Sequence, residues 1–194
     1  MNATGFIDPT KSPEPVAPHN PTPENTITPT PALPDELSLP IDNISNDLNN
    51  FYKNGWQGLY QSDEFDCSRM TTYMWDYIRS KYKIAPEIVL APDRKHAWLA
   101  LKVVDAGDSE KYIQWTIKGI KYYYIEATVP QVVKYEKDFT MGSVKYESSS
   151  DFYTTEIYVA DDPVDANIIA GSWFNEFRLT KSDIDKLNLY KLGK

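Results

Sequence analysis

The sequence predicts an α+β domain in which helices pack on an antiparallel sheet. Residues 41–52 and 67–78 place their apolar side chains at helical spacing. From residue 84 onward, short runs rich in β-branched and aromatic residues alternate with polar turns. A loop over residues 105–111 and a turn at residues 118–120 separate three of these runs, which suggests an antiparallel meander.

The 194-residue chain is long enough for one well-buried domain, which we place at residues 41–194. Residues 1–40 are crowded with proline, threonine, asparagine and glutamate and have almost no aromatic side chains. Such a segment cannot bury enough apolar surface to offset the entropy of ordering it. We therefore predict a disordered stalk or linker over residues 1–40.

A proline- and threonine-rich stalk ahead of a folded domain is typical of exported, surface-tethered proteins. We expect an extracellular or cell-surface protein whose signal or anchor has been removed from this chain. No apolar run in the sequence approaches the roughly 20 residues that span a bilayer. The net charge of −8 and the lack of a lysine or arginine stripe argue against a nucleic-acid partner.

The second predicted helix begins at Cys67, the only cysteine in the chain, after a loop over residues 56–63. We expect Ser62 or Asp63 to cap this helix. Counting back along its apolar face places the thiol inward, toward the sheet. A helix N-terminus offers partial positive charge that favours a thiolate, and the thiolate is the nucleophilic form of cysteine. The apolar face comprises Met70, Tyr73, Met74, Tyr77 and Ile78.

A short β-type run over residues 84–92 and a polar turn at 93–95 lead to a strand over residues 96–104 that begins at His96. The side chains of this strand that point to the face opposite His96 are strongly apolar, so we expect that face to form the core. His96 is then expected at a strand end on the less apolar side. Two further strands, 112–117 and 121–128, are expected to place Glu126 near the His96 strand.

The second half of the domain has weaker patterns. Residues 153–160 and 177–179 are predicted as strands, and residues 181–187 as a terminal helix capped by Thr180. Residues 146–151, with three consecutive serines, are predicted as a mobile surface loop.

Cys67 and His96 are the residue types that nucleophilic acyl transfer requires. The other histidine, His19, lies in the proline-rich segment. In such chemistry a thiolate attacks a carbonyl carbon, an imidazole pairs with the thiolate and protonates the leaving amine, and an acid orients the imidazole. Taken alone, a buried cysteine is more often a small core residue, and Glu126 is more simply a solvent-facing strand residue.

The order of these residues resembles the transglutaminase-like superfamily of papain-like thiol enzymes. The matching elements are Cys67 at a helix start, His96-Ala97-Trp98 at a strand start and Glu126-Ala127-Thr128, over roughly residues 56–130. The resemblance implies a transglutaminase-like (papain-like) core, with the catalytic helix packed on the antiparallel sheet, and a Cys67-His96-Glu126 triad. This sequence has Glu126 where the family usually has aspartate, and Asp66 where a small residue usually precedes the cysteine.

The resemblance also implies an oxyanion hole built from the Cys67 backbone N–H and a side chain of the upstream segment. The candidates for that side chain are Trp56, Tyr60, Gln57 and Gln61, with the two aromatic residues ranked first. Trp98 is a further candidate for substrate contact, although it is most simply a sheet-packing residue. The acidic residues near Asp161 match no calcium-loop spacing, so we assign no metal and no cofactor.

The sequence therefore leads us to expect thiol-dependent acyl transfer on amide or isopeptide bonds of a protein or peptide substrate at a cell surface. Hydrolysis is favoured over cross-linking, and both proceed through the same thioester. The alternative is a catalytically silent, surface-displayed binding or adhesion module with the same fold. The arrangement of Cys67, His96 and Glu126 in space distinguishes the two hypotheses.

Overall fold

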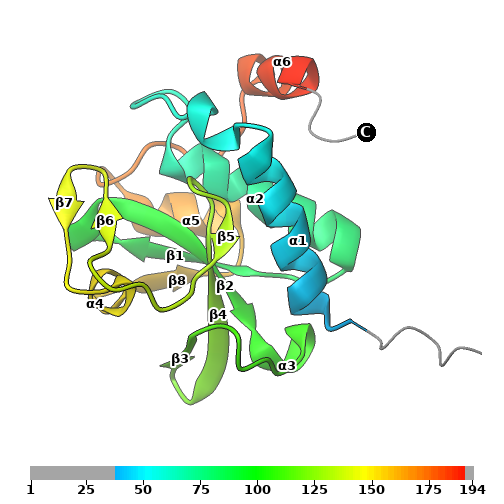
Figure 1. The fold of residues 1–194 in the computed structure, drawn as a ribbon. Helices are drawn as coiled ribbons and strands as arrows, with labels where there is room; N and C mark the ends of the chain where they lie inside the picture. Colours follow the sequence, from blue (N-terminus) through cyan, green and yellow to red (C-terminus); the bar gives the residue numbers. More distant parts are fainter. Residues whose placement is uncertain (1–37, 191–194) are drawn as a thin grey trace, which may run out of the picture. The chain divides into compact units, whose positions relative to one another are not determined.

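The computed structural model describes residues 38–190 (Figure 1). The stalk predicted for residues 1–40 lies outside the described residues except at its end, and Pro40 already begins helix α1 (Pro40–Lys53). Proline suits this position because its fixed φ angle matches the first helical turn and its missing N–H is not needed there. Across the described residues, no helix combines the length and the apolar character needed to cross a bilayer.

The central sheet has six strands in the order β3-β4-β2-β1-β8, with β5 also paired to β4. All of its strand pairs are antiparallel. The mixed α+β architecture and the antiparallel sheet agree with the prediction, but the predicted meander was wrong, because β4 pairs directly with β2 and β3 lies at the edge of the sheet. The strands are β1 (Glu87–Ala91), β2 (His96–Lys102), β3 (Gln114–Ile117), β4 (Ile120–Glu126), β5 (Gln131–Val132) and β8 (Tyr158–Ala160).

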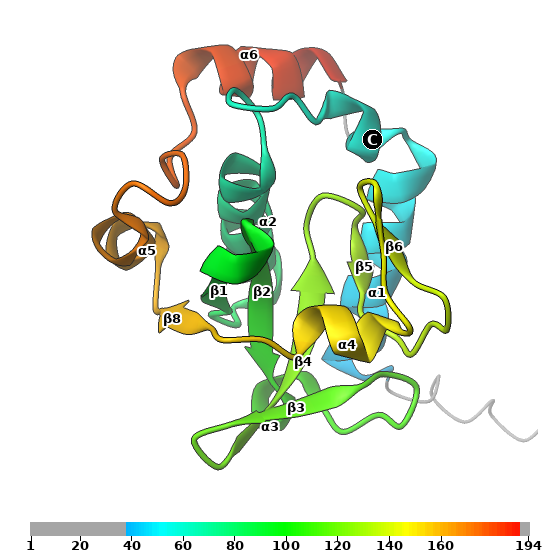
Figure 2. The same ribbon diagram turned by 90° about the vertical axis from the view of Figure 1, so that its left-hand side faces the viewer.

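Helices cover both faces of this sheet (Figures 1 and 2). Helices α1, α2 (Cys67–Tyr82) and α5 (Pro163–Ala170) contribute side chains to one hydrophobic core. The short helix α4 (Ser149–Tyr153) contributes to a second core on the opposite face. The remaining elements are η1 (Trp56–Leu59), η2 (Pro92–Arg94), α3 (Val103–Ala106), the hairpin of β6 (Thr140–Met141) and β7 (Val144–Lys145), and α6 (Lys181–Tyr190).

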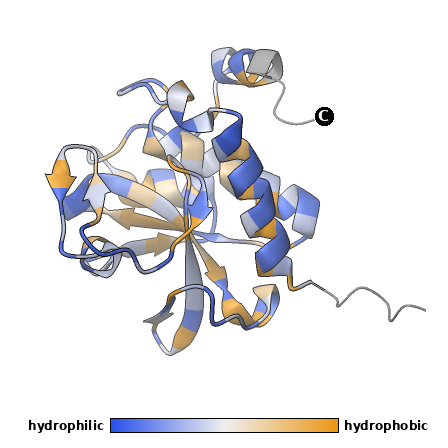
Figure 3. Cartoon of the chain, in the orientation of Figure 1, coloured by the Kyte–Doolittle hydropathy of each residue, from blue (hydrophilic) through white to orange (hydrophobic). Residues whose placement is uncertain are grey.

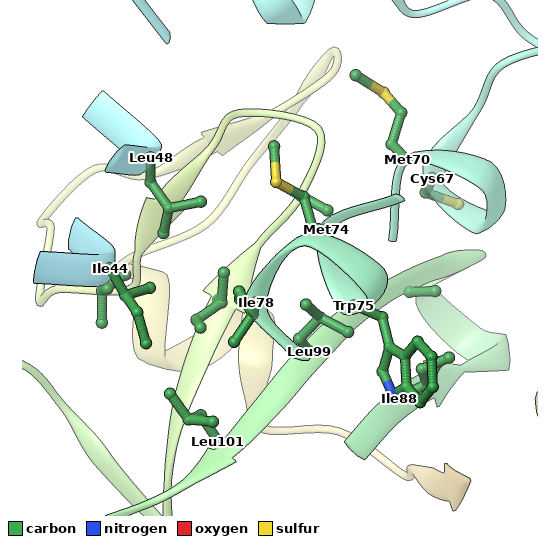
Figure 4. Packing of buried hydrophobic residues seen from close by; sticks show 14 of the residues in the cluster. Ile44, Leu48, Cys67, Met70, Met74, Trp75, Ile78, Ile88, Leu99 and Leu101 are labelled. Carbon is green, nitrogen blue, oxygen red and sulfur yellow. The ribbon is translucent and has the colours of Figure 1, made fainter. Parts of the chain in front are cut away.

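The first core lies between helices α1 and α2 and the sheet (Figure 4). Met74 and Ile78 of α2 are fully buried in it, together with Leu99 of β2. The indole nitrogen of Trp75 donates a hydrogen bond of 2.8 Å to the Pro86 carbonyl oxygen, which fixes α2 against the chain that enters β1. Figure 3 shows that the outward surface of α1 is mostly hydrophilic, as expected for a helix that packs on the core with its other side.

The second core lies on the sheet face that carries His96. This face was expected to be the less apolar side, but it is also buried. His96 is 8% exposed, and Trp98 on the same face is fully buried. Helix α4 covers this face with Phe152 and Tyr153, although Tyr153 was expected to begin a strand directly after a surface loop. The prediction of a single core face was wrong because the chain that covers the second face lies some fifty residues away in sequence.

Several boundaries in the second half also differ from the prediction. The strand from His96 ends at Lys102, because residues 103–106 form helix α3. The predicted loop at 146–151 contains the start of α4, for which Ser148 is the N-cap. The predicted strand at 153–160 is reduced to 158–160, residues 177–179 form no strand, and helix α5 was not predicted. Asp162 caps α5 by accepting from two backbone N–H groups, a signal present in the sequence.

Candidate active site

The cysteine helix begins as predicted at Cys67, but its cap is Asp66 rather than Ser62 or Asp63. Oδ1 of Asp66 accepts a hydrogen bond of 3.0 Å from the Ser68 backbone N–H. Its Oδ2 accepts a hydrogen bond of 2.7 Å from the side-chain amide of Asn175. The carboxylate beside the cysteine is thus used to cap the helix, as its position favours at the positive end of the helix dipole.

Helix α2 directs the Cys67 thiol toward the start of strand β2. Cys67 is 6% exposed, and its Sγ lies 4.0 Å from the carbonyl oxygen of Lys95, the residue before His96. One turn further along the helix, the Thr71 hydroxyl donates a hydrogen bond of 3.2 Å to the Ala97 carbonyl oxygen. Figure 4 shows Cys67 beside Met70, at the edge of the first core. The helix start and the strand start are therefore held together.

Sheet register brings His96 and Glu126 to the same end of the sheet. Strands β2 and β4 are antiparallel with Leu99 opposite Ile125. Continuing that register places Glu126 opposite Trp98, two residues from His96 and on the same face of the sheet. The sequence prediction that Glu126 lies near the His96 strand depended on this pairing.

His96 forms a buried ion pair with Glu126. Its Nε2 lies 2.8 Å from Oε2 of Glu126, which leaves Nδ1 as the ring nitrogen for the thiol. Burial alone would lower the pKa of the imidazole, but the negative charge of Glu126, reinforced by hydrogen bonding and by the nearby Cys67 thiol, raises that pKa to about 10. The imidazole therefore carries its proton at neutral pH.

Glu126 is fully buried and accepts four hydrogen bonds. Oε1 accepts from the Thr128 backbone N–H at 2.8 Å and from its hydroxyl at 2.6 Å. Oε2 accepts from the Tyr153 hydroxyl at 2.9 Å as well as from His96. Burial would raise the pKa of Glu126, but the positive charge of His96 and these hydrogen bonds lower it. Glutamate thus takes the position where aspartate was expected, and it remains ionised.

The structure gives Trp56 and Gln61 hydrogen bonds to other residues and buries Trp98. Trp56 is fully buried, and its indole nitrogen donates a hydrogen bond of 2.6 Å to the Ala127 carbonyl oxygen. The side-chain oxygen of Gln61 accepts from Lys186 at 3.0 Å. Trp98 is fully buried in the second core. The roles of Trp56 and Trp98 are therefore structural in this arrangement, since neither ring reaches solvent.

Tyr60 and Gln57 remain as candidates for the oxyanion side chain. Tyr60 is 47% exposed, and its pKa is raised first by burial and then by the nearby groups of Cys67 and Asp66. The Oε1 of Gln57 is buried and has no hydrogen-bond partner among residues 38–190. The backbone N–H of Cys67 is at the first position of α2, where no helical carbonyl can accept it. Tyr60 and this N–H are therefore the candidate donors for an oxyanion.

Two residues that support the site were not identified from the sequence. Tyr153 donates to Glu126 from a helix that was predicted as strand and loop, and Asn175 donates to Asp66 from a segment with no regular pattern. No local signal marks either residue, because both contacts join positions far apart in the chain. Thr128, which also supports Glu126, belongs to the Glu-Ala-Thr element quoted for the family resemblance.

The site brings together a buried thiol, a protonated imidazole and an ionised carboxylate. This set matches the requirements of acyl transfer through a thioester. Comparisons of the chain with protein-family profiles, with curated proteins and with solved structures find no match.

Proposed function

We propose that this domain is a transglutaminase-like (papain-like) thiol enzyme that transfers acyl groups from amide or isopeptide bonds through Cys67, His96 and Glu126. The observation that carries this proposal is the buried His96–Glu126 ion pair beside the thiol. Removing two charges from water is costly, and a structural core gains little from such a pair. A thiol enzyme, in contrast, needs an imidazolium held next to its sulfur.

The proposed reaction begins with Cys67 as thiolate beside the protonated imidazole of His96. The sulfur attacks the carbonyl carbon, and the carbonyl π electrons move to the oxygen. The Cys67 N–H, with Tyr60 as the proposed second donor, stabilises this oxyanion. His96 then gives its proton to the leaving nitrogen, the carbon–nitrogen bond breaks, and a thioester with an amine or ammonia remains.

Water or a primary amine then resolves the thioester. His96, now neutral, takes a proton from the attacking molecule, the carbon–sulfur bond breaks, and the thiolate returns. Water gives a carboxylic acid, and an amine gives a new amide bond. Hydrolysis is the proposed outcome, on a protein or peptide substrate in an extracellular or cell-surface setting, which the proline- and threonine-rich composition of residues 1–40 supports.

Trapping the acyl-enzyme tests this function. We expect an activated ester, p-nitrophenyl acetate, to acylate Cys67 and release a burst of nitrophenol, with the adduct located by peptide mass spectrometry. Glutamine-containing peptides then test amide cleavage, and a labelled primary amine added to the reaction separates cross-linking from hydrolysis.

Matched variants decide the outcome. Cys67→Ala should abolish the adduct, and His96→Ala should slow its formation by about 100-fold, since general acid–base groups contribute 10²–10⁴-fold. Tyr52→Phe, an exposed tyrosine on α1, should behave as the unmodified protein. Equal acylation with and without His96 would favour the silent binding module instead.

A further inference from the structure

The Tyr153 hydroxyl shares a single carboxylate oxygen with His96. It donates a hydrogen bond of 2.9 Å to Oε2 of Glu126, the oxygen that lies 2.8 Å from His96 Nε2. Tyr153 is 2% exposed, so water does not compete for this bond. A buried phenol that donates to a buried carboxylate is a strong, charge-assisted contact.

Helix α4, which carries Tyr153 at its last position, is anchored at both ends. The Ser149 hydroxyl at its start donates to the Lys134 carbonyl oxygen at 2.7 Å and accepts from the Glu136 backbone N–H at 3.0 Å. At its end, Arg94 donates to the carbonyl oxygens of Phe152 at 3.2 Å and Asp151 at 3.1 Å. Arg94 lies two residues before His96, so one short segment both carries His96 and anchors helix α4.

The ring of Tyr153 has little freedom to move. It packs edge-on against Trp98 with the ring centroids 5.1 Å apart, and against Phe152 with the centroids 4.8 Å apart. Trp98 in turn lies 6.0 Å from the His96 ring. The second core therefore fixes the hydroxyl direction toward Glu126 by shape as well as by hydrogen bonding.

We propose that Tyr153 is a positioning residue that holds the Glu126 carboxylate in the orientation and the charge state that His96 requires. This inference rests on the proposed function for its catalytic meaning, although the contact itself is independent of any reaction. Within residues 38–190 the carboxylate receives four donor groups, and Tyr153 is the only one of them from outside strands β2 and β4 and the turn that follows β4. Helix α4 thus supports Glu126 from the sheet face opposite to the cysteine helix α2.

The charged and titratable groups around this contact set its pH dependence. From β2 the imidazolium of His96 faces Glu126, and on the other side of that ring lies the Cys67 thiol of α2. Glu136 contributes a negative charge near Tyr153, and Arg94 a positive charge over the Phe152 ring. Loss of the Tyr153 donor would leave the negative charge of Glu126 less stabilised, so Glu126 would become protonated at a higher pH.

The test compares Tyr153→Phe with Tyr124→Phe, which removes a hydroxyl from another buried ring of the same core. His96 ring N–H and ¹⁵N signals are recorded at pH 7, with His19 replaced by Gln so that only one histidine remains. We expect the His96 N–H proton to move downfield in Tyr153→Phe, because Oε2 then serves a single donor, and to stay in place in Tyr124→Phe. Unchanged signals in both variants would overturn the inference.

The pH profile of Cys67 alkylation by iodoacetamide provides the functional measurement. In Tyr153→Phe the acid limb should move upward by about one pH unit, the size expected for losing one hydrogen bond to a charged group. The rate at pH 7 should change less than about threefold, since Glu126 remains ionised there. A purely structural role would lower the rate at all pH values without moving the limb, which would also overturn the inference. If the His96 signal moves while alkylation does not depend on His96, the positioning contact stands and the acyl-transfer proposal fails.

Discussion

The indole nitrogen of Trp56 donates a hydrogen bond of 2.6 Å to the carbonyl oxygen of Ala127, across 71 residues of sequence. Trp56 belongs to η1, which precedes the cysteine helix, and Ala127 directly follows Glu126. The contact therefore joins the segment that precedes Cys67 to the end of the strand that carries Glu126. Its removal should affect stability and reactivity together.

Trp56→Phe should lower the free energy of unfolding by about 2 kcal/mol, since it loses a buried hydrogen bond and leaves a small cavity. Urea denaturation monitored by circular dichroism measures this loss. Tyr60→Phe, in the same segment but half exposed, should stay within about 0.5 kcal/mol of the unmodified protein. Similar losses in the two variants would show that the Ala127 contact contributes nothing.

The His96–Glu126 pair predicts a defined pH dependence of stability. Because the folded state raises the pKa of His96 from 6.5 to about 10, its contribution is complete below pH 6.5 and is lost as pH rises toward 10. Because the pKa of Glu126 is lowered from 4.5, its contribution is complete above pH 4.5 and is lost as pH falls through the folded value. The contribution of this pair to the free energy of unfolding should therefore be greatest between pH 4.5 and pH 6.5.

Glu126→Gln should reverse the direction in which the stability contributed by His96 changes with pH. Without the carboxylate, burial of His96 lowers the pKa of the imidazole, so the variant should lose stability as pH falls through about 6.5. NMR titration of His96 and thermal unfolding across pH measure both changes. Glu87→Gln, which removes a carboxylate that pairs with Lys102 at the surface, should leave the His96 titration in place. A Glu126→Gln profile that follows the unmodified protein would contradict the ion pair.

Asp66 and Asp162 provide a matched pair of helix caps, at α2 and α5. Asp66→Ala and Asp162→Ala should each cost about 1 kcal/mol in unfolding free energy. Only Asp66→Ala should also slow iodoacetamide alkylation of Cys67, by about tenfold, since small displacements of a reacting group are costly. Asp66→Asn should retain most of both properties, because asparagine is also a good cap. Equal alkylation rates in all three variants would show that the Asp66 cap does not influence the reactivity of Cys67.

Arg94→Gln should loosen helix α4. It replaces two charge-assisted hydrogen bonds to the carbonyl oxygens of Asp151 and Phe152, and we expect a loss of about 1–2 kcal/mol in stability. Backbone amides of residues 149–153 should exchange with solvent faster, as measured by hydrogen–deuterium exchange. Lys95→Gln, at the neighbouring exposed position, is the control. Unchanged protection of α4 would mean that packing of Phe152 and Tyr153 alone holds it.

The parts of the fold that the sequence predicted are those with local periodic signals. The cysteine helix and the His96 strand each carry a pattern that spans several residues, and their starting positions agree with the structure. The helix and the strand depend on sequence neighbours, so single-sequence reasoning reaches them. The predicted meander was wrong in its order, because β4 rather than β3 pairs with β2, and it is this direct pairing that brings Glu126 near His96.

The burial of the His96 face could not be predicted in the same way. It depends on α4, a helix of five residues that ends in Phe152 and Tyr153, and so short a helix gives too few repeats to show a period. The Asn175–Asp66 hydrogen bond likewise joins residues 109 positions apart. Such contacts are decided by tertiary packing, which no local pattern in the chain records.

The β2–β4 pairing has a consequence for the order in which the chain folds. Cys67, His96 and Glu126 lie on α2, β2 and β4, and the acid meets the base only when Leu99 pairs with Ile125. Closing such a non-local pairing is slower than forming a helix turn. A newly synthesised chain can therefore form its cysteine helix before the ion pair exists, so His96-dependent reactivity of the thiol would report completion of the sheet during refolding.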